Sequence, residues 1–341
     1  MDSVELDTNA ALMVAPGKGI LAADESTGTI KKRFDKIGLE SSVESRRSYR
    51  ELLFTAPDAE KYISGVILYD ETLRQQTADG RSFPALLAAR GILPGIKVDA
   101  GAKPFAGFPG ETVTEGLDGL RERLAEYRGL GARFAKWRAV IDVGAGIPTA
   151  AALEANAHAL ARYAALCQEA SIVPIVEPEV LMDGDHTIGR CEEVTDAALE
   201  LVFDALFRQR VRLEGMILKP NMVIAGKKCA VQAPPQQVAE ATLRCLLRRV
   251  PAAVPGIAFL SGGQSEADAT LHLSLMNGAG VKQPWQLSFS YGRALQQSTL
   301  DAWRGKPGNV AAAQRTFLRR ARLNGLARDG RYQAAMEQAA A

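Results

Sequence analysis

Eight short apolar runs recur along the 341 residues, and longer segments with helical spacing separate them. Strands that alternate with helices in this way are typical of parallel βαβ units rather than of a sandwich. The runs are Ile20–Asp24, Gly65–Asp70, Gly95–Asp99, Phe134–Val140, Val173–Glu177, Gly215–Lys219, Ile257–Ser261 and Gln286–Ser290. Because eight parallel strands close a barrel, the sequence predicts an α/β protein with a (β/α)8 TIM-barrel fold.

Helical segments connect these runs. Alanine and leucine are dense in Thr149–Gln168, and apolar residues follow helical intervals in Val194–Gln209. Ser41–Phe54 and Asn309–Ala341 are also predicted to be helical and to lie outside the minimal repeat, as extra N- and C-terminal helices. Since no linker or low-complexity stretch divides the chain, we predict one barrel domain over residues 1–341, with a C-terminal tail at about 333–341.

The charges of the chain are nearly balanced, with 41 Lys and Arg against 39 Asp and Glu. The two signs are interspersed along the sequence. The densest basic cluster consists of Arg315, Arg319, Arg320 and Arg322, whose spacing suits one solvated side of a helix. We therefore expect no nucleic-acid partner and no membrane surface.

The cysteines also indicate the cellular setting. Cys167, Cys191, Cys229 and Cys245 are widely spread and form no CxxC pair, which argues against a disulfide framework and a zinc cluster. The first residues show no basic region followed by an apolar core, and no later run approaches the ~18 apolar residues of a membrane span. These features predict a cytoplasmic protein.

Three lysines stand inside apolar stretches, where a lysine is costly: Lys97, Lys136 and Lys219. In a low dielectric a lysine loses proton affinity, so its neutral amine can attack a carbonyl and form a Schiff base. At each position the alternative is a side chain that only extends its amine to water at a strand end. The three together favour Schiff-base chemistry.

Polar residues fall at the ends of several runs, and in such a barrel catalytic groups gather at the C-terminal ends of the strands. Asp24, Lys97, Asp99, Glu177, Lys219 and Ser261 are placed in this way. Residues two apart on a strand share a face, so Lys136 accompanies Arg138, and Glu177 accompanies Glu179. Interior salt bridges without a catalytic role are the alternative for each pair. The whole set predicts one polar cavity.

Two further segments suggest phosphate binding. They are Ser261-Gly-Gly-Gln264 after the seventh run and Ser290-Tyr-Gly-Arg293 after the eighth. Loops after strands 7 and 8 frequently hold phosphate through backbone N–H groups and a helix N-terminus. A glycine-rich turn alone is weak support, because many such turns serve only backbone geometry. Arg293 adds a guanidinium suited to phosphate.

Six segments carry a resemblance to a known family. They are GILAADESTG at 19–28, AKWR at 135–138, IVEPE at 175–179, LKPNM at 218–222, LSGGQSE at 260–266 and FSYGRAL at 289–295. Together they resemble class I fructose-bisphosphate aldolase, in order and without large gaps, from about Leu12 to Tyr332. The resemblance implies a metal-independent (β/α)8 lyase of glycolysis and gluconeogenesis, without a cofactor. It cleaves fructose 1,6-bisphosphate reversibly into dihydroxyacetone phosphate and glyceraldehyde 3-phosphate.

The resemblance also implies roles for individual residues. Lys219 matches the Schiff-base nucleophile, and Glu177 matches the general acid and base of imine formation. Asp24 matches the carboxylate that meets the C4 hydroxyl. Lys136 matches a lysine that helps to keep Lys219 unprotonated, while Glu179 and Arg138 position these groups. The site of the phosphate nearest the ketone is matched by Ser261, Gly262, Ser290, Gly292 and Arg293, and the rest of the substrate by Ser26, Thr29 and Lys97.

Assembly and the C-terminal tail complete what the resemblance implies. The family is commonly a homotetramer, and we carry this state over as an expectation. Many members end in a mobile tail with a terminal tyrosine that assists proton exchange on the enamine. The last tyrosine here is Tyr332, so we predict retained cleavage with a slower or differently limited enamine protonation step.

Three other hypotheses stay open. A metal-dependent aldolase needs several histidine ligands, but only His158, His186 and His272 exist, and Asp183-Gly-Asp-His186 is better explained as a polar loop. A related Schiff-base aldolase could prefer sedoheptulose 1,7-bisphosphate or fructose 1-phosphate. A scaffold protein without catalysis is the third, since a fold alone does not fix a function.

Overall fold

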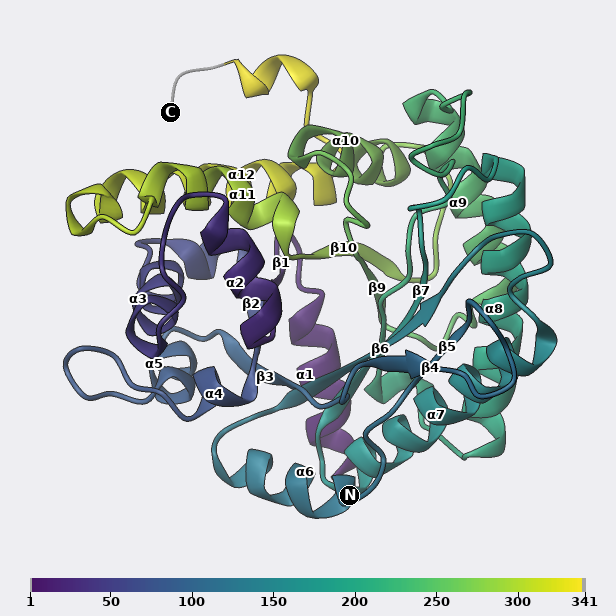
Figure 1. Cartoon of the computed structure of the whole chain (residues 1–341), viewed down its shortest axis with the longest axis horizontal. Coiled ribbons are helices and arrows are strands. Elements are labelled where there is room, and N and C mark those ends of the chain that lie inside the picture. Colours follow the sequence, from purple (N-terminus) through teal and green to yellow (C-terminus); the bar gives the residue numbers. More distant parts are fainter. Residues whose placement is uncertain (1, 339–341) are drawn as a thin grey trace.

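The computed structural model describes residues 2–338 and shows a closed barrel of eight parallel strands, in the order β1-β10-β9-β8-β7-β6-β3-β2 (Figure 1). The strands are β1 (Gly19–Ala23), β2 (Ile63–Leu68), β3 (Leu93–Lys97), β6 (Phe134–Ile141), β7 (Val173–Val180), β8 (Ile217–Leu218), β9 (Gly256–Phe259) and β10 (Gln286–Tyr291). Each of the eight apolar runs overlaps one of these strands. The predicted (β/α)8 barrel is therefore confirmed.

The barrel interior is filled in two layers, because alternate residues of a strand share a face. The lower layer is apolar and includes Phe134, Ile175 and Ile217, all fully buried. The Phe134 ring needs room: a Cβ added to Gly95 would lie 2.2 Å from it, and one added to Gly65 would lie 2.9 Å away. Glycine on β2 and β3 thus lets one aromatic ring fill the centre of the barrel.

Helix α1 (Ser3–Met13) closes the lower end of the barrel, which is the end where the strands begin. Its residues Leu6, Ala10 and Met13 are fully buried and belong to the same apolar cluster as the lower strand residues. In Figure 1 this helix lies near the middle of the ring of strands. The prediction of an extra N-terminal helix placed it at Ser41–Phe54 and missed α1.

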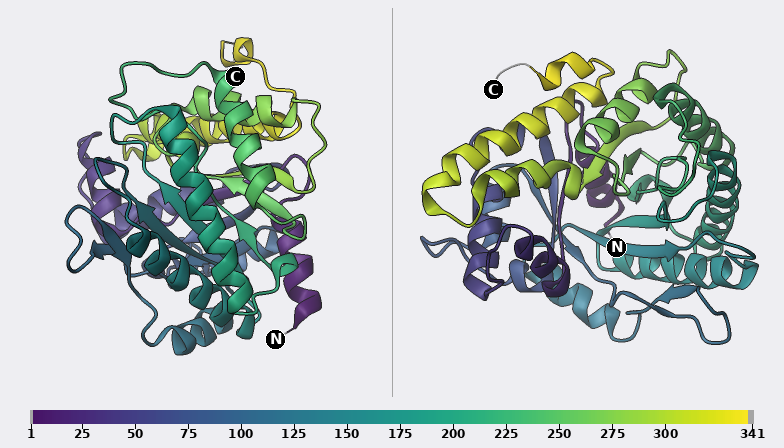
Figure 2. Two further views of the ribbon diagram at one scale, coloured as in Figure 1. Left: turned by 90° about the vertical axis from the view of Figure 1, so that its right-hand side faces the viewer. Right: turned by 45° about the horizontal axis from the view of Figure 1, so that its top comes forward.

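The remaining helices surround the barrel (Figure 2). They are α2 (Thr27–Asp35), α3 (Val43–Phe54), α4 (Asp70–Leu73), α5 (Phe83–Ala89), α6 (Leu120–Gly129), α7 (Ala150–Glu169), α8 (Ile188–Arg208), α9 (Pro235–Arg249), α10 (Glu266–Asn277), α11 (Arg293–Trp303) and α12 (Val310–Arg328). A small hairpin of β4 (Ala102–Pro104) and β5 (Thr112–Thr114) follows β3.

The helix predictions held in outline and failed at particular ends. Helix α7 matches its prediction, whereas α8 begins six residues earlier than predicted, at Ile188, where Thr187 caps it. Helix α3 forms as predicted but lies between β1 and β2, within the barrel repeat.

The C-terminal segment is not one continuous helix. Helix α12 ends at Arg328, because Gly330 takes a left-handed conformation with φ of 68°. A short 3-10 turn follows at Ala334–Glu337. Residues 339–341 of the predicted helix and tail lie outside the described residues.

The basic cluster of α12 also differs from its prediction. Arg315 and Arg322 are exposed, but Arg320 is only 4% exposed. Its guanidinium forms ion pairs with Glu337 at 2.6 Å and donates to the Thr270 hydroxyl at 2.7 Å. The α12 arginines therefore do not form a single solvated stripe.

Candidate active site

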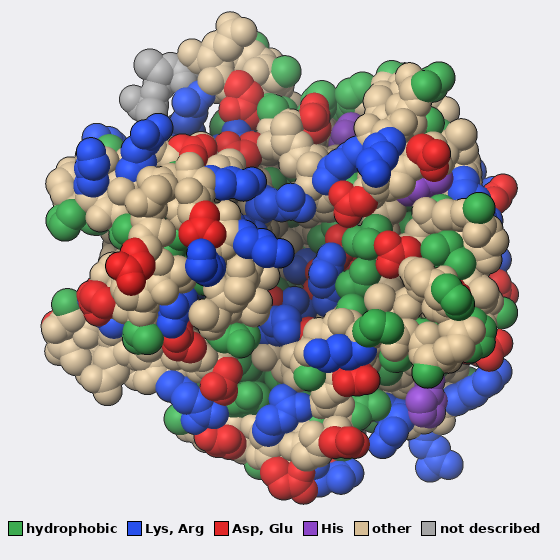
Figure 3. Space-filling model, in the orientation of Figure 1, with side chains coloured by type: hydrophobic (Ala, Val, Ile, Leu, Met, Phe, Trp, Pro, Cys, Tyr) green, Lys and Arg blue, Asp and Glu red, His purple; other side chains and the backbone are tan. Residues whose placement is uncertain are grey.

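A cavity of about 480 Å³ opens at the C-terminal ends of the strands. Six Lys or Arg and five Asp or Glu side chains line it. Figure 3 shows a hollow near the centre of one face, with Lys and Arg side chains around it. All of the fourteen site residues predicted from the sequence line this cavity. A balanced set of buried charges with a slight positive excess suits an anionic substrate.

Two lysines and two carboxylates meet at the floor of this cavity. Lys219 Nζ lies 3.0 Å from Glu177 Oε1, while Lys136 Nζ lies 3.4 Å from Glu177 Oε2 and 2.7 Å from Asp24 Oδ2. Lys136, Glu177 and Lys219 are each no more than 4% exposed. Glu177 therefore stands between two amines, in contact with both.

The strand pattern explains this meeting. On β7 the inward positions are Val173, Ile175, Glu177 and Glu179, so the apolar layer ends where the carboxylates begin. Lys219 follows the two-residue strand β8, and its N–H donates to the Val176 carbonyl at 2.8 Å. The backbone at Lys219 is thereby fixed beside β7, which brings its amine to Glu177.

The charges of this cluster perturb one another. Burial alone would raise the pKa of the Asp24 carboxyl, but the positive charges of Lys136 and Lys219 outweigh it and lower this pKa to about 2. Burial alone would lower the pKa of Lys136, but the carboxylates of Asp24 and Glu177 raise it above its ordinary value. Asp24 and Lys136 are consequently both ionised at neutral pH.

The lowered pKa of Asp24 makes the stability of the fold sensitive to acid. The pKa falls from an ordinary 3.8 to about 2 in the folded chain, so the stabilisation is present above the ordinary value and is lost as the pH falls towards 2. We expect Asp24 to account for a loss of about 1 kcal/mol in unfolding free energy between about pH 5 and pH 3. Urea unfolding at both pH values checks this, with Asp24→Asn as the comparison. Equal pH dependence in the two proteins would contradict it.

Two further ion pairs border the cluster. Arg138 pairs with Glu179, the next inward residue after Glu177 on β7. Lys97 Nζ lies 2.6 Å from Asp99 Oδ1 and also donates to the Asp99 carbonyl at 2.8 Å. Lys97 thus lines the cavity but is held by Asp99, so the three lysines singled out by sequence do not share one partner.

The loops after β9 and β10 form the other wall. Gly262 and Gly263 have φ values of 52° and 76°, which only glycine adopts readily, and the Gln264 N–H closes the turn onto the Ser261 carbonyl at 2.9 Å. Gly292 precedes α11 and offers no capping side chain, so the first N–H groups of that helix stay available to an anion.

A buried hydroxyl points to a ligand at this wall. Ser290 is 1% exposed, and its Oγ has no hydrogen-bond partner among residues 2–338. Arg293 also lines the cavity here, and it forms no ion pair within the described chain. An unpaired hydroxyl and an unpaired guanidinium on one wall are suited to a phosphate group.

The first turn of α2 lies across the cavity. Ser26 and Thr29 line it, and their hydroxyls are 3.1 Å apart. The same helix brings Arg33 to the cavity, a residue that the sequence analysis missed. The sequence did contain a signal for Arg33. It stands four residues after Thr29, so both residues share one face of the helix that starts within the motif Gly19–Gly28.

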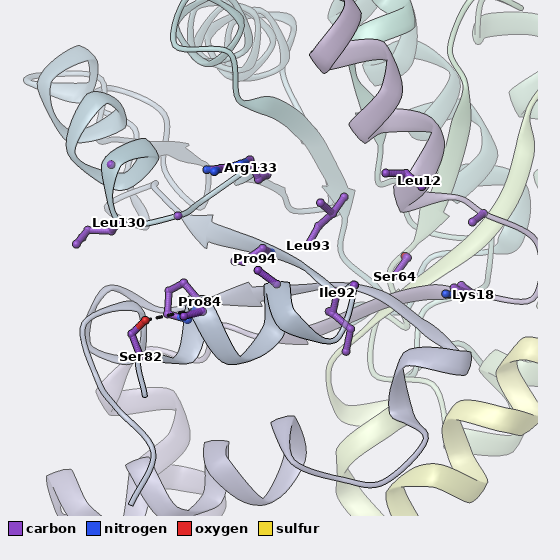
Figure 4. A pocket seen from close by; sticks show the side chains of 16 residues that line it. Leu12, Lys18, Ser64, Ser82, Pro84, Ile92, Leu93, Pro94, Leu130 and Arg133 are labelled. Atoms are coloured by element: carbon purple, nitrogen blue, oxygen red, sulfur yellow. Dashed lines mark hydrogen bonds between the residues drawn. The ribbon is translucent and has the colours of Figure 1, made fainter. Parts of the chain in front are cut away.

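A second cavity lies at the opposite, N-terminal end of β3. It measures about 430 Å³ and is lined by Leu12, Ile92, Leu93, Lys18 and Arg133 among others (Figure 4). Its walls are mostly apolar, and Lys18 is not opposed there by a lining carboxylate. It lacks the combination of amine and carboxylate that carbonyl chemistry requires, so the upper cavity is the candidate active site.

The histidines do not gather into a metal centre. His158 lies on α7, His272 on α10, and His186 in the loop before α8. Over residues 2–338, no group of three or more His, Cys, Asp or Glu side chains is arranged to hold a metal ion.

The chain is similar to known proteins over almost its whole length. Residues 5–341 match the family model of fructose-bisphosphate aldolase class-I, a longer span than the Leu12–Tyr332 estimated from the sequence. The chain is 59% identical to a probable fructose-bisphosphate aldolase class 1 of Xanthomonas campestris, covering 97% of this chain and 99% of that one. It is 56% identical to the cytoplasmic isozyme of Spinacia oleracea, with 96% and 92% covered.

A solved structure shows the same fold. Fructose-bisphosphate aldolase from Plasmodium falciparum superimposes with a TM-score of 0.95 at 51% sequence identity, covering 97% of this chain and 95% of that chain. The chain therefore belongs to the class I fructose-bisphosphate aldolase family, and it is a lyase that cleaves fructose 1,6-bisphosphate reversibly through a lysine Schiff base.

Proposed function

We propose that Lys219 is the amine that attacks the ketone carbon C2 of fructose 1,6-bisphosphate, and that Glu177 moves the protons of this step. The observation that carries the proposal is the 3.0 Å contact between Lys219 Nζ and Glu177 Oε1 in a buried site. A carboxylate in contact with the nucleophile can accept its proton and return it to the departing oxygen.

The sequence of bonds follows from this pair. The Lys219 nitrogen adds to C2 and gives a carbinolamine, and protonated Glu177 donates a proton to its hydroxyl, which leaves as water. The product is a protonated imine. The C3–C4 bond then breaks as the C4 hydroxyl loses its proton, which releases glyceraldehyde 3-phosphate, and the electron pair flows to the imine nitrogen and gives an enamine. Protonation of the enamine at C3 and hydrolysis release dihydroxyacetone phosphate and the free amine.

Asp24 and Lys136 are proposed to serve the cleavage step. The C4 hydroxyl must lose its proton as the aldehyde forms, and ionised Asp24 is available to accept a hydrogen bond from it. Lys136 Nζ, 2.7 Å from Asp24 Oδ2 and 3.4 Å from Glu177 Oε2, holds both carboxylates. Because burial is outweighed by the carboxylates of Asp24 and Glu177, the pKa of Lys136 is raised and its amine stays protonated beside them. Arg138 and Glu179 are proposed to position the cluster, since Glu179 lies two residues beyond Glu177 on β7 and pairs with Arg138.

The two ends of the cavity are proposed to hold the two phosphates. Ser261, Gly262, Ser290, Gly292 and Arg293 form the wall assigned to the phosphate nearest the ketone. Ser26, Thr29 and Lys97 are assigned to the rest of the substrate. The available N–H groups of α11 and the unpaired Ser290 hydroxyl support the first assignment.

Replacing Arg293 with methionine tests this wall. We expect KM for fructose 1,6-bisphosphate to rise roughly 10- to 100-fold, because the substrate loses charge-assisted hydrogen bonds of a guanidinium. Steady-state kinetics measure it, with Arg244→Met as the matched control, since Arg244 pairs with Glu192 away from the cavity. An unchanged KM in Arg293→Met would remove Arg293 from the phosphate site.

Turnover on three ketoses measures the substrate preference. We expect kcat/KM to be highest for fructose 1,6-bisphosphate, compared with sedoheptulose 1,7-bisphosphate and fructose 1-phosphate, and to be unaffected by EDTA. A higher value for either alternative would reassign the substrate, whereas loss of activity in EDTA would bring back a metal-dependent mechanism. No turnover on any of them would favour the scaffold hypothesis.

We also infer a cytoplasmic homotetramer that folds as one barrel domain per chain. The relative from Spinacia oleracea is named a cytoplasmic isozyme and one from Arabidopsis thaliana is named cytosolic. No helix among residues 2–338 is long and apolar enough to cross a membrane. Light scattering measures the assembly.

A further inference from the structure

A buried three-charge cluster lies directly beside the catalytic floor. Glu25, the neighbour of Asp24, receives one arginine from each of two helices. Arg33 of α2 places Nη1 2.5 Å from Glu25 Oε1, and Arg50 of α3 places Nη2 2.7 Å from Glu25 Oε2. Each oxygen of the carboxylate therefore has its own guanidinium.

The two arginines are not equivalent. Arg33 and Glu25 line the active-site cavity, whereas Arg50 does not, and its side chain is only 3% exposed against 17% for Arg33. A Cβ added to Gly292 would lie 3.8 Å from Arg33 Nη2, so this nitrogen faces the loop proposed to bind phosphate. Arg33 is therefore part of the cavity wall, whereas Arg50 lies behind that wall.

We propose that Arg50 is a positioning residue that keeps the Arg33 guanidinium free for the phosphorylated substrate. Arg33 makes one hydrogen bond with the described residues, from Nη1 to Glu25 Oε1. Without Arg50, the free oxygen Oε2 would accept a second bond from Arg33, because guanidinium and carboxylate prefer a paired, two-bond geometry. Arg33 would then be turned onto Glu25 and away from the cavity.

The surroundings of Glu25 hold its carboxylate in place, so it cannot move away from a second bond with Arg33. Gln296 Nε2 donates to Glu25 Oε1 at 3.1 Å and to the Ala22 carbonyl at 2.8 Å, which ties the carboxylate to the end of β1. With both arginines present the cluster carries a net positive charge. With Arg33 alone it is neutral and attracts a phosphate less.

Burying Arg50 also carries a cost in the free energy of folding. Its Nε and Nη1 are buried without a hydrogen-bond partner among residues 2–338, and unpaired buried donors carry a desolvation cost. An apolar side chain of similar size would avoid that cost. Arg50→Met is therefore expected to fold, since Glu25 keeps its partner Arg33.

The experiment compares KM and kcat of Arg50→Met, Arg33→Met and the double variant with the parent chain. This inference rests on the proposed binding of fructose 1,6-bisphosphate in the cavity. We expect Arg50→Met to raise KM about 10-fold with kcat within about 2-fold, and the double variant to match Arg33→Met, because Arg50 acts through Arg33. Borohydride trapping with unphosphorylated dihydroxyacetone should proceed at the parent rate in Arg50→Met.

Arg46→Met is the matched control. Arg46 lies one turn before Arg50 on α3 and also pairs with a glutamate, forming two hydrogen bonds with Glu71, at 2.7 and 2.6 Å, outside the cavity. Its loss should lower the melting temperature without changing KM. A KM rise in Arg46→Met equal to that in Arg50→Met would show a general effect of α3 and overturn the inference.

The remaining outcomes are equally clear. An unchanged KM in Arg50→Met, or additive effects in the double variant, would overturn the role of Arg50 while leaving the proposed function intact. If Arg50→Met does not fold, Arg50→Lys is the variant to measure. It keeps a cation on Glu25 Oε2, so its KM should stay near that of the parent. A KM as high as that of Arg33→Met would overturn the proposal. A parent chain without turnover would instead refute the proposed function.

Discussion

Replacing Lys219 with alanine is expected to abolish the covalent adduct that borohydride traps from dihydroxyacetone phosphate. Among the described residues, the Lys219 amine is the group that contacts Glu177 Oε1 and can form a bond to the ketone. Without it no imine forms, so kcat/KM for fructose 1,6-bisphosphate should fall by roughly 10⁵-fold. Mass spectrometry of the trapped protein, followed by peptide mapping, measures the adduct and its position.

Lys18→Ala is the matched control for this experiment. Lys18 lines the cavity at the opposite end of the barrel, so its removal should leave the adduct and the kinetics unchanged. An adduct that persists in Lys219→Ala, or that maps to Lys136 or Lys97 in the parent chain, would refute Lys219 as the nucleophile.

Glu177→Gln is expected to have the second-largest effect. The amide keeps the shape of the side chain but can neither accept the proton of Lys219 nor donate one to the carbinolamine oxygen. It also leaves Lys136 and Lys219 without the negative charge that both contact. Loss of a general acid and base of this kind lowers kcat by about 10³-fold. Rapid-quench borohydride trapping measures the rate of imine formation directly.

The control for this variant is another buried glutamate. Glu111 is 5% exposed and accepts hydrogen bonds from the Thr149 N–H at 2.6 Å and hydroxyl at 2.8 Å, outside the active-site cavity. Glu111→Gln should reduce stability but not the rate of trapping. If Glu177→Gln forms the adduct at the parent rate, Glu177 does not act in imine formation, and another group must move the protons.

The sequence contained enough information for the barrel and for the chemical cluster. Eight apolar runs became eight strands because the barrel buries short segments on both faces. The two-residue period then placed Lys136 with Arg138, and Glu177 with Glu179, on the inner face. Polar residues at strand ends met in one cavity for the same reason. Local pattern and global fold agree here, so local reasoning sufficed.

Contacts between distant segments could not be predicted in this way. Helix α1 was missed because its apolar residues are buried by strand residues that lie far away in the sequence. Arg50 and Arg33 meet at Glu25 from two different helices, a meeting that no spacing in the chain indicates. Arg320 was assigned to water, but Glu337 and Thr270 bury it from other elements. In each case tertiary packing decided the environment.

The closed lower end of the barrel gives the bound substrate a structural part to play. Helix α1 and the apolar layer above it fill that end with buried side chains, whereas the Lys219 cluster faces the cavity at the other end. A sugar phosphate bound in that cavity displaces water from it. We expect the bound substrate to shield the enamine proposed on Lys219 from bulk water. A helix far from Lys219 in the sequence thereby closes the barrel end opposite the active-site cavity.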